Sequence, residues 1–331
     1  MKTNKTNLQI GVVGVGTMGQ HHVRILSQTP DVSLAGIYDP DFSRAEAIGG
    51  RYGCRSFRSL MELLERTDAV AIAAPTSLHW DIGETCLKRG IHTLMEKPLA
   101  HSLPCAEKLV DLASDVGVVL MVGHVERYNP AIGKMMEILH SEPEEIVSID
   151  ARRLSPFDGT RCLDVDVLHD LLIHDIDLAL EIANSSIIEV SATGRPVFSQ
   201  RLDMAHTRIQ FANQTVAVFW TAKCSPRKVR IITVTTPSRY FEADTLSRSL
   251  TVYTAEDLPA MDSGVCVMGN IIREEIPVGD EEPLRLEIND FVRAVLEGSP
   301  PTVDGERGLQ ALRVLELVAR SIESNPSQHF I

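Results

Sequence analysis

The sequence predicts a two-domain α/β protein, in which a doubly wound parallel sheet precedes an α+β domain with a large, open, mainly antiparallel sheet. Three observations support this fold class. The chain has 331 residues, which is long for one hydrophobic core and suits two domains. Its first third alternates short apolar runs with amphipathic segments. Beyond residue 185, strand-like runs follow one another with little helix between them.

Composition places the chain among globular proteins and excludes several classes of function. Hydrophobic residues make up 44% and charged residues 23% of the chain, as in folded domains. The net charge of −13 argues against a broad surface for nucleic acid or anionic lipid, because both need clustered Lys and Arg. Six cysteines without a C-x-x-C pair predict neither a zinc knuckle nor a disulfide framework. With no apolar run of ~18 residues and no secretory signal, a cytoplasmic protein is expected.

The first 124 residues are predicted to form the parallel sheet. Strand-like runs occupy residues 8–14, 32–39, 68–75, 91–98 and 118–124. They are rich in Val, Ile, Leu and Ala, which is typical of strands buried on both faces of a parallel sheet. Segments that predict helices lie between them, at about 17–28, 41–51, 59–66, 78–89 and 102–116. This βαβ rhythm predicts a doubly wound sheet.

Residues 125–331 are predicted to form the second domain. A helix, a strand and a second helix are expected first, over about 130–141, 145–154 and 165–183. Strand-like runs follow at 187–198, 206–212, 215–223, 228–236, 239–244 and 249–254. Turn signals separate these runs, which predict a largely antiparallel sheet of about six strands. Two helices close the chain, near 284–297 and 305–323.

A glycine-rich turn follows the first predicted strand. Gly14, Gly16 and Gly19 form a G-x-G-x-x-G pattern, with Thr17 and Met18 between the last two. Gly14 permits a tight turn, Gly16 lets the backbone approach a pyrophosphate, and Gly19 allows close helix–strand packing. The N-terminus of the next helix supplies oriented N–H groups. The pattern predicts a dinucleotide-binding Rossmann domain.

Asp39 ends the second predicted strand, 20 residues beyond the last glycine of the turn. A carboxylate at this position bonds the ribose diol of a dinucleotide. The alternative is an ordinary glycine turn followed by a polar strand end. Because Asp39 would repel a 2′-phosphate, NAD is expected as the cofactor. Arg44 lies one turn into the next helix. An arginine there can bind a 2′-phosphate, so NADP is the alternative cofactor.

Glu96-Lys97-Pro98 closes the 91–98 strand, at the edge where open α/β sheets place their ligands. A lysine there is suited to donate to a sugar hydroxyl and to stabilise the alkoxide that develops during hydride loss. The alternative is an ordinary strand-end lysine in solvent.

The predicted 165–183 helix carries a second chemical signal. Asp166, Asp170, His174 and Asp177 follow i, i+4, i+8 and i+11 spacing, so an α-helix would place them on one face. Flanking carboxylates favour the imidazolium and fix the ring, which suits a general base that takes a hydroxyl proton. A solvated polar stripe and a metal-binding face are the alternatives. No fourth ligand stands out, and no metal is expected.

Polar residues gather near the domain junction. Four are arginines: Arg127, Arg152, Arg153 and Arg161. Arginine suits bidentate binding of phosphate or carboxylate; Arg152 and Arg153 are adjacent on a strand, so only one of them can face a cleft. Three more follow the 118–124 strand: His124, Tyr128 and Asn129. Scattered surface side chains are the alternative for each.

Taken together, these residues resemble the Gfo/Idh/MocA family, named for glucose–fructose oxidoreductase and inositol dehydrogenase. The resemblance covers nearly the whole chain. It rests on the glycine turn, Glu96-Lys97-Pro98, the D-x-x-x-H pattern from Asp170 to His174, the run from Leu286 to Ser321, and Asp304-Gly305. The segment from Pro75 to His79 matches the frequent P-N-x-x-H of the family, with Thr76 in place of asparagine.

The resemblance implies an enzyme that transfers hydride between NAD(P) and a hydroxyl-bearing carbon of a sugar or cyclitol. Lys97 and His174 would be the catalytic pair, in either order of base and stabiliser, with Asp170 beside them. Besides the glycine turn and Asp39, cofactor contacts would come from Pro75, Thr76, His79, Glu96 and Lys97. The C-terminal sheet would join a homodimer or homotetramer.

Two runs favour one subgroup of the family. Residues 123–130 and 170–177 resemble members that act on nucleotide sugars, notably UDP-N-acetylglucosamine 3-dehydrogenases. These oxidise the C3 hydroxyl to a ketone, which an aminotransferase can then aminate. The expected substrate contacts are His124, Arg127, Tyr128, Asn129, Arg152, Arg153 and Asp170. A dehydrogenase of a free sugar or inositol, and a non-catalytic NAD-binding regulator, are the alternatives.

Overall fold

The computed structural model describes residues 7–157, 165–255 and 271–324 of the chain. The chain divides into two compact units. The first comprises residues up to Val125 together with Glu282–Leu312, and the second comprises Glu126–Glu281 and the residues from Arg313 onward. No helix in the described ranges is both long and apolar enough to cross a membrane.

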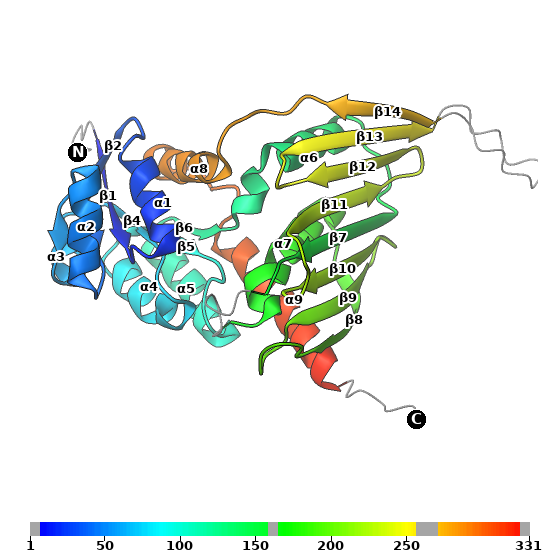
Figure 1. The fold of residues 1–331 in the computed structure, drawn as a ribbon. Coiled ribbons are helices and arrows are strands. Elements are labelled where there is room, and N and C mark those ends of the chain that lie inside the picture. Colours follow the sequence, from blue (N-terminus) through cyan, green and yellow to red (C-terminus); the bar gives the residue numbers. More distant parts are fainter. Residues whose placement is uncertain (1–6, 158–164, 256–270, 325–331) are drawn as a thin grey trace, which may run out of the picture. The chain divides into compact units, whose positions relative to one another are not determined.

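The first unit is built on a six-stranded sheet in which every pair of neighbouring strands is parallel. Its strands are β1 (Leu8–Val13), β2 (Val32–Tyr38), β3 (Ser56–Phe57), β4 (Ala69–Ile72), β5 (His92–Glu96) and β6 (Leu120–Gly123). Their order is β3-β2-β1-β4-β5-β6 (Figure 1). The order therefore reverses between β1 and β4, which is the switch point where open sheets bind ligands beyond the carboxyl ends of their strands. This confirms the predicted doubly wound sheet.

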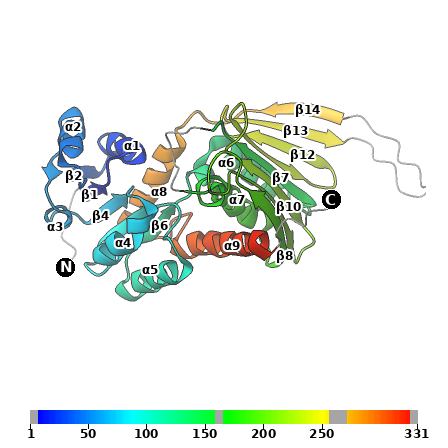
Figure 2. The ribbon, with the colours of Figure 1, turned by 60° about the horizontal axis from the view of Figure 1, so that its bottom comes forward.

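Amphipathic helices flank this sheet. They are α1 (Thr17–Leu26), α2 (Phe42–Tyr52), α3 (Leu60–Leu64), α4 (His79–Leu87), α5 (Leu103–Val116) and α8 (Pro283–Glu297). In α5, Ala106, Leu109 and Ala113 are buried, at the spacing that puts side chains on one helix face. The helix α1 packs beside α2 and α8, and α4 packs beside α5 (Figure 2).

Residues 282–312 pack with the first unit, whereas the sequence analysis assigned all of 125–331 to the second domain. The helix α8 lies against α1, and Arg24 of α1 forms an ion pair with Glu282. The backbone N–H of Val122 in β6 donates to the carbonyl of Val303 at 3.0 Å. These contacts join segments far apart in sequence, and an amphipathic pattern does not show which sheet a helix covers.

The second unit contains an eight-stranded sheet with the order β14-β13-β12-β11-β7-β10-β9-β8 (Figure 1). The strands are β7 (Ser148–Leu154), β8 (Ile187–Arg195), β9 (Met204–Phe211), β10 (Val216–Ala222), β11 (Val229–Thr235), β12 (Arg239–Asp244), β13 (Ser249–Ala255) and β14 (Ile271–Ile276). Only β7 and β10 pair in parallel, so the mainly antiparallel sheet is confirmed. The edge strand β14 was not predicted, because it is exposed along almost its whole length and carries no apolar alternation.

One face of this sheet is buried and the other is open. The helices of this unit are α6 (Pro130–Ser141), the turn η3 (Leu168–Leu172), α7 (Ile173–Ala183) and the end of α9 (Gly305–Ser324). Of these elements, α6, η3 and α7 contact strands of the sheet. The opposite face exposes Val218, Trp220 and Tyr240. An oligomer interface on this sheet stays a prediction.

Glu287 of α8 is a buried acid with no evident partner in the first unit. Its side chain is fully buried, and neither carboxyl oxygen has a hydrogen-bond partner among the described residues. Burial, together with the nearby charges of Glu96 and Asp290, raises the pKa of Glu287 well above its usual value. The folded protein therefore favours the protonated form of this carboxyl more strongly than the unfolded chain does.

We expect Glu287 to make the stability of the protein depend on pH. Since its folded pKa lies above the unfolded one, its contribution is fully present below the unfolded pKa and is lost as the pH rises through the folded pKa. Each unit of that rise corresponds to about 1.4 kcal/mol. Urea unfolding between pH 5 and 9 should show a decline that Glu287→Gln removes. Glu297→Gln, at the exposed end of the same helix, is the control; equal pH dependence in all three proteins would contradict this expectation.

Candidate active site

The turn between β1 and α1 has the geometry of a pyrophosphate cradle. Gly14 has a φ of +83°, which favours glycine. A Cβ on Gly19 would lie 1.9 Å from the carbonyl oxygen of Gly14, so no other residue fits there. A Cβ on Gly16 would meet no atom within 4 Å, so the backbone there borders open space. Thr17 and Met18 are exposed in the first turn of α1, where free N–H groups bind anions.

Asp39 lies directly after β2, against the glycine turn. Its Oδ2 accepts a hydrogen bond from the N–H of Val15 at 2.9 Å, and its Oδ1 accepts one from the N–H of Asp41 at 2.9 Å. Arg44 Nη1 lies 3.5 Å from Asp39 Oδ1. The carboxylate is 5% exposed, so these bonds fix it beside the turn. Its remaining lone pairs suit a ribose diol, and the glycine cradle and this carboxylate together fit NAD.

His79 ties two loops at the carboxyl ends of β4 and β5. It begins α4, after the short turn η1 (Thr76–Leu78). Its Nδ1 lies 2.8 Å from the carbonyl oxygen of Pro98, and its Nε2 lies 2.9 Å from that of Ala74. Burial lowers the pKa of His79 against the pull of these two carbonyls. The predicted cofactor residues Pro75 and Thr76 thereby stand on a loop fastened to the segment after Lys97.

Lys97 follows β5 directly, and the residue before it, Glu96, forms a part-buried hydrogen bond. Glu96 Oε1 lies 2.9 Å from His22 Nε2 of α1. Burial opposes ionisation of Glu96, but the hydrogen bond and the electrostatic attraction of His22 outweigh it, so the pKa of Glu96 is lowered. Glu96 was predicted to contact the cofactor; the structure shows that it also anchors the strand end that carries Lys97.

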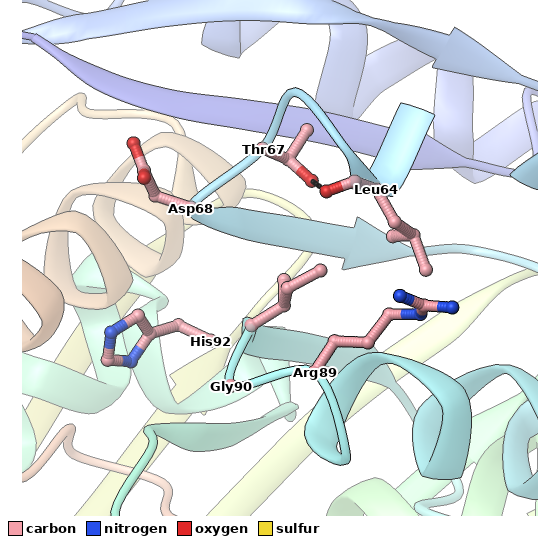
Figure 3. A pocket seen from close by; sticks show the side chains of 7 residues that line it. Leu64, Thr67, Asp68, Arg89, Gly90 and His92 are labelled. Carbon is pink, nitrogen blue, oxygen red and sulfur yellow. Dashed lines mark hydrogen bonds between the residues drawn. The ribbon is translucent and has the colours of Figure 1, made fainter. Parts of the chain in front are cut away.

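A polar pocket lies at the opposite edge of the same sheet (Figure 3). Its lining is Leu64, Thr67, Asp68, Arg89, Gly90, Ile91 and His92. Asp68 and His92 stand at the amino-terminal ends of β4 and β5, far along the strands from Lys97. Since open α/β sheets bind ligands beyond the carboxyl ends, this pocket is separate from the cofactor cradle.

In the second unit, the segment with Asp170 and His174 begins as a π-helix. The turn η3 is π-helical, and α7 starts only at Ile173. The N–H of Asp170 donates to the carbonyl of Asp166 at 3.2 Å, which is α-helical spacing. A π turn holds more residues than an α turn, so that spacing does not hold through Leu168–Leu172 and does not extend the face from Asp166 to His174. Asp166 instead pairs with His169, with 2.8 Å between Oδ1 and Nδ1. Such π turns are frequent at functional sites.

Asp170 is held by Lys223, a residue that the sequence analysis did not select. Lys223 follows β10, and its Nζ lies 3.0 Å from Asp170 Oδ2 and donates to the carbonyl of Val165 at 3.0 Å. Its backbone N–H donates to the carbonyl of Asp203 at 2.7 Å. The ammonium thus joins the π turn to the end of β10. The only sequence signal was a polar residue at a strand end, which does not identify a distant partner.

Arg127 forms ion pairs with two carboxylates of its own unit. Its Nε lies 2.6 Å from Asp177 Oδ2, and its Nη1 lies 2.6 Å from Glu181 Oε2. Asp177 is 1% exposed, so it is not part of a solvated stripe and its carboxylate is committed to Arg127. A substrate phosphate at Arg127 would have to displace these partners.

Arg153 is occupied in the same way. Its Nε donates to Asp175 Oδ1 at 2.8 Å, and its Nη1 donates to Glu126 Oε1 at 2.7 Å. It lies on the buried side of β7, whereas Arg152 lies on the exposed side, as strand alternation requires. Arg161 lies outside the described residues. Of the two predicted substrate contacts Arg152 and Arg153, the buried one, Arg153, is therefore already paired with carboxylates of the protein.

The polar residues after β6 have different environments. His124 is buried and Tyr128 is half-buried. Asn129 caps α6: its Oδ1 accepts a hydrogen bond from the N–H of Ala131 at 3.1 Å, and its Nδ2 donates to the carbonyl of Thr245 at 3.0 Å. An amide used in this way stabilises the start of the helix. Its predicted role in substrate binding stays a prediction.

The fold and the glycine cradle define the class of this protein as an NAD-binding oxidoreductase with a Rossmann domain. Comparison with known families agrees. The Gfo/Idh/MocA oxidoreductase family matches through its NAD-binding Rossmann fold over residues 8–124 and through its C-terminal alpha/beta domain over residues 165–327. The chain belongs to this family, and it is a dehydrogenase that acts on CH–OH groups.

Named relatives extend over the whole chain. UDP-N-acetylglucosamine 3-dehydrogenase of Acidithiobacillus ferrooxidans is 30% identical over 321 residues, which cover 96% of this chain and 98% of that protein. Its solved structure matches with a TM-score of 0.87, over 96% of this chain and 98% of that one. Myo-inositol 2-dehydrogenase of Thermotoga maritima is 24% identical over 97% of this chain and 98% of that protein. A levoglucosan dehydrogenase in complex with NADH, 19% identical over 96% of this chain and 97% of that one, shares the fold with a TM-score of 0.86.

We expect Lys223 to act on turnover by positioning Asp170. Lys223→Met removes the ammonium that holds this carboxylate. Because Asp170 is expected beside the catalytic pair, its misplacement should lower kcat about tenfold to a hundredfold. The Kd for NAD should not change, since the cofactor cradle lies in the other unit. Lys223→Arg, which keeps a cation, should recover part of the loss. Lys228→Met, exposed before β11, is the control; a kcat of Lys223→Met equal to that of Lys228→Met would count against this role.

Proposed function

We propose that this protein oxidises the C3 hydroxyl of a nucleotide sugar, such as UDP-N-acetylglucosamine, with NAD as the hydride acceptor. The observation that carries the proposal is the similarity to UDP-N-acetylglucosamine 3-dehydrogenase, which is 30% identical and spans 96% of this chain. The similarity includes the second unit, to which we assign substrate binding. The inositol dehydrogenases that also span the chain are 24% and 25% identical.

In this proposal, Lys97 and His174 carry the chemistry. NAD, when bound, supplies the ring carbon that accepts the hydride. His174, oriented by Asp170, removes the hydroxyl proton, while Lys97 hydrogen-bonds the same oxygen and stabilises its developing negative charge. The opposite assignment, with Lys97 as base, gives the same balance, in which one proton goes to the base and one hydride leaves with two electrons.

The residues of the first unit bind and orient the cofactor. The turn from Gly14 to Gly19 binds the pyrophosphate through backbone N–H groups, because no side chain fills the space at Gly16. Asp39, already fixed by the N–H of Val15, accepts from the ribose diol. Its negative charge disfavours a 2′-phosphate, which supports NAD over NADP.

Substrate turnover tests the proposed reaction. We expect NADH absorbance to rise when the full chain is mixed with NAD and UDP-N-acetylglucosamine. Because formation of a 3-keto product is unfavourable, an aminotransferase with glutamate should be added in a parallel reaction to remove the product. Glucose and inositol are the comparison substrates. Turnover on free polyols alone would replace the nucleotide-sugar proposal with the free-sugar alternative.

Substitution of the proposed catalytic pair tests the mechanism. Lys97→Ala and His174→Ala should each lower kcat by at least about a thousandfold, since each removes a group that acts on the reacting oxygen. The Kd for NAD, measured by quenching of protein fluorescence, should stay within about twofold of the wild-type value, since the cradle is untouched. Lys88→Ala, at the exposed end of α4, serves as the matched lysine control. Wild-type turnover in either variant would refute the assignment.

A further inference from the structure

Arg230 is a buried cation whose hydrogen bonds all end on neutral oxygens. It lies in β11 and is 8% exposed. Its Nη1 donates to the carbonyls of Leu154 and Val229, and its Nη2 donates to Ser155 Oγ at 2.8 Å. Within residues 7–157, 165–255 and 271–324, no carboxylate bonds it. Arginine is almost never buried without a charged partner, so this side chain needs an explanation.

The charges of Asp175, Glu126 and Asp170 partly offset that of Arg230, but its own hydrogen bonds end on neutral oxygens. Arg153 lies directly opposite it in the β7–β11 pairing, and both side chains are on the buried face of the sheet. The nearby carboxylates of Asp175 and Glu126 bind Arg153 instead. Burial and the charge of Arg153 lower the pKa of Arg230 to about 10, which still leaves it a cation at neutral pH. Two adjacent guanidinium groups, one without a carboxylate partner, favour the binding of an anion.

Arg230 lies at the same edge of the sheet as the segment with Asp170. The parallel strands β7 and β10 end there, and β11 enters from that edge. The N–H of Ser155, which follows β7, donates to the carbonyl of Ala222 at 2.8 Å. The next residue, Lys223, binds Asp170. The charge of Asp170 also acts on Arg230, so the buried cation and the proposed catalytic segment are neighbours within one unit.

We propose that Arg230, together with Ser155, binds the anionic portion of the substrate, a phosphate or diphosphate group. This inference rests on the proposed function, in which the substrate is a nucleotide sugar. The guanidinium fork matches phosphate geometry. The Ser155 hydroxyl accepts from Arg230 through its oxygen and keeps its own hydrogen to donate. A phosphate gives Arg230 charge-assisted bonds that its carbonyl acceptors do not give, whereas Arg127 and Arg153 already have such bonds.

Binding of UDP and of inorganic pyrophosphate to the full chain, measured by titration calorimetry, tests this site. Wild-type protein should bind both and should bind uridine far more weakly. Arg230→Met should weaken UDP binding about tenfold or more, with Arg230→Lys between the two. The KM for UDP-N-acetylglucosamine should rise by a similar factor, with the Kd for NAD unchanged. Arg273→Met, which removes an exposed arginine of β14, is the matched control and should bind UDP like the wild type.

Two results would overturn the anion site. One is unchanged UDP affinity in folded Arg230→Met; the other is a wild-type protein that binds neither UDP nor pyrophosphate. If Arg230→Met does not fold, Ser155→Ala removes a single half-buried hydroxyl and should lower UDP affinity about threefold or more, and unchanged affinity there is equally decisive. Failure of the proposed function is a distinct result: UDP binding that depends on Arg230, without turnover of any nucleotide sugar, supports the site and removes the reaction.

Discussion

The close approach of α1 to β1 at Gly19 is the contact on which the first unit depends. With 1.9 Å between a hypothetical Cβ there and the Gly14 carbonyl, the helix can begin where it does only because the side chain is absent. This start directs the N–H of Val15 to Asp39. It also places His22, one turn further along α1, against Glu96. One steric condition therefore fixes both the cofactor cradle and the strand end that carries Lys97.

In the second unit, buried ion pairs have the corresponding role. Arg127 joins the turn after β6 to α7 through Asp177, and Arg153 joins β7 to α7 through Asp175. Removing one partner of such a pair leaves an uncompensated buried charge, which costs about 3–5 kcal/mol. The helix that carries His174 is therefore held to the sheet by charges as well as by its apolar residues. Arg230 differs because its partners are neutral.

The fold was predictable where the signal was local. The glycine turn and Asp39 lie within 40 residues of one another, and the βαβ rhythm repeats between neighbouring segments; the family, the fold class and the cofactor are confirmed. The position of α8 was not predictable, because its partner α1 lies more than 250 residues away, as in the bond between Arg24 and Glu282. The π turn was missed because α-helical periodicity was assumed for the whole 165–183 segment.

The residues of the candidate site were likewise predictable from the sequence only where the signal was local. Residue type correctly marked arginine as a binder of carboxylates, but for Arg127 and Arg153 the carboxylates belong to the protein. Lys223 and Arg230 lie at strand ends with unremarkable sequence neighbours, and their importance follows only from contacts across the sheet. Sequence spacing identifies residues that act through neighbours on the same helix or turn. It does not identify residues brought together by strand pairing.

The division of the chain has a consequence for biosynthesis. The first unit consists of residues up to Val125 and of Glu282–Leu312, so α8 and the first residues of α9 are translated only after the strands of the eight-stranded sheet. When translation has reached residue 281, all six strands of the first sheet have been synthesised, but α8, which packs against α1, has not. Until that helix emerges, apolar surface on α1 is open to chaperones and to other nascent chains. The first unit is therefore completed only after the strands of the second unit have been synthesised.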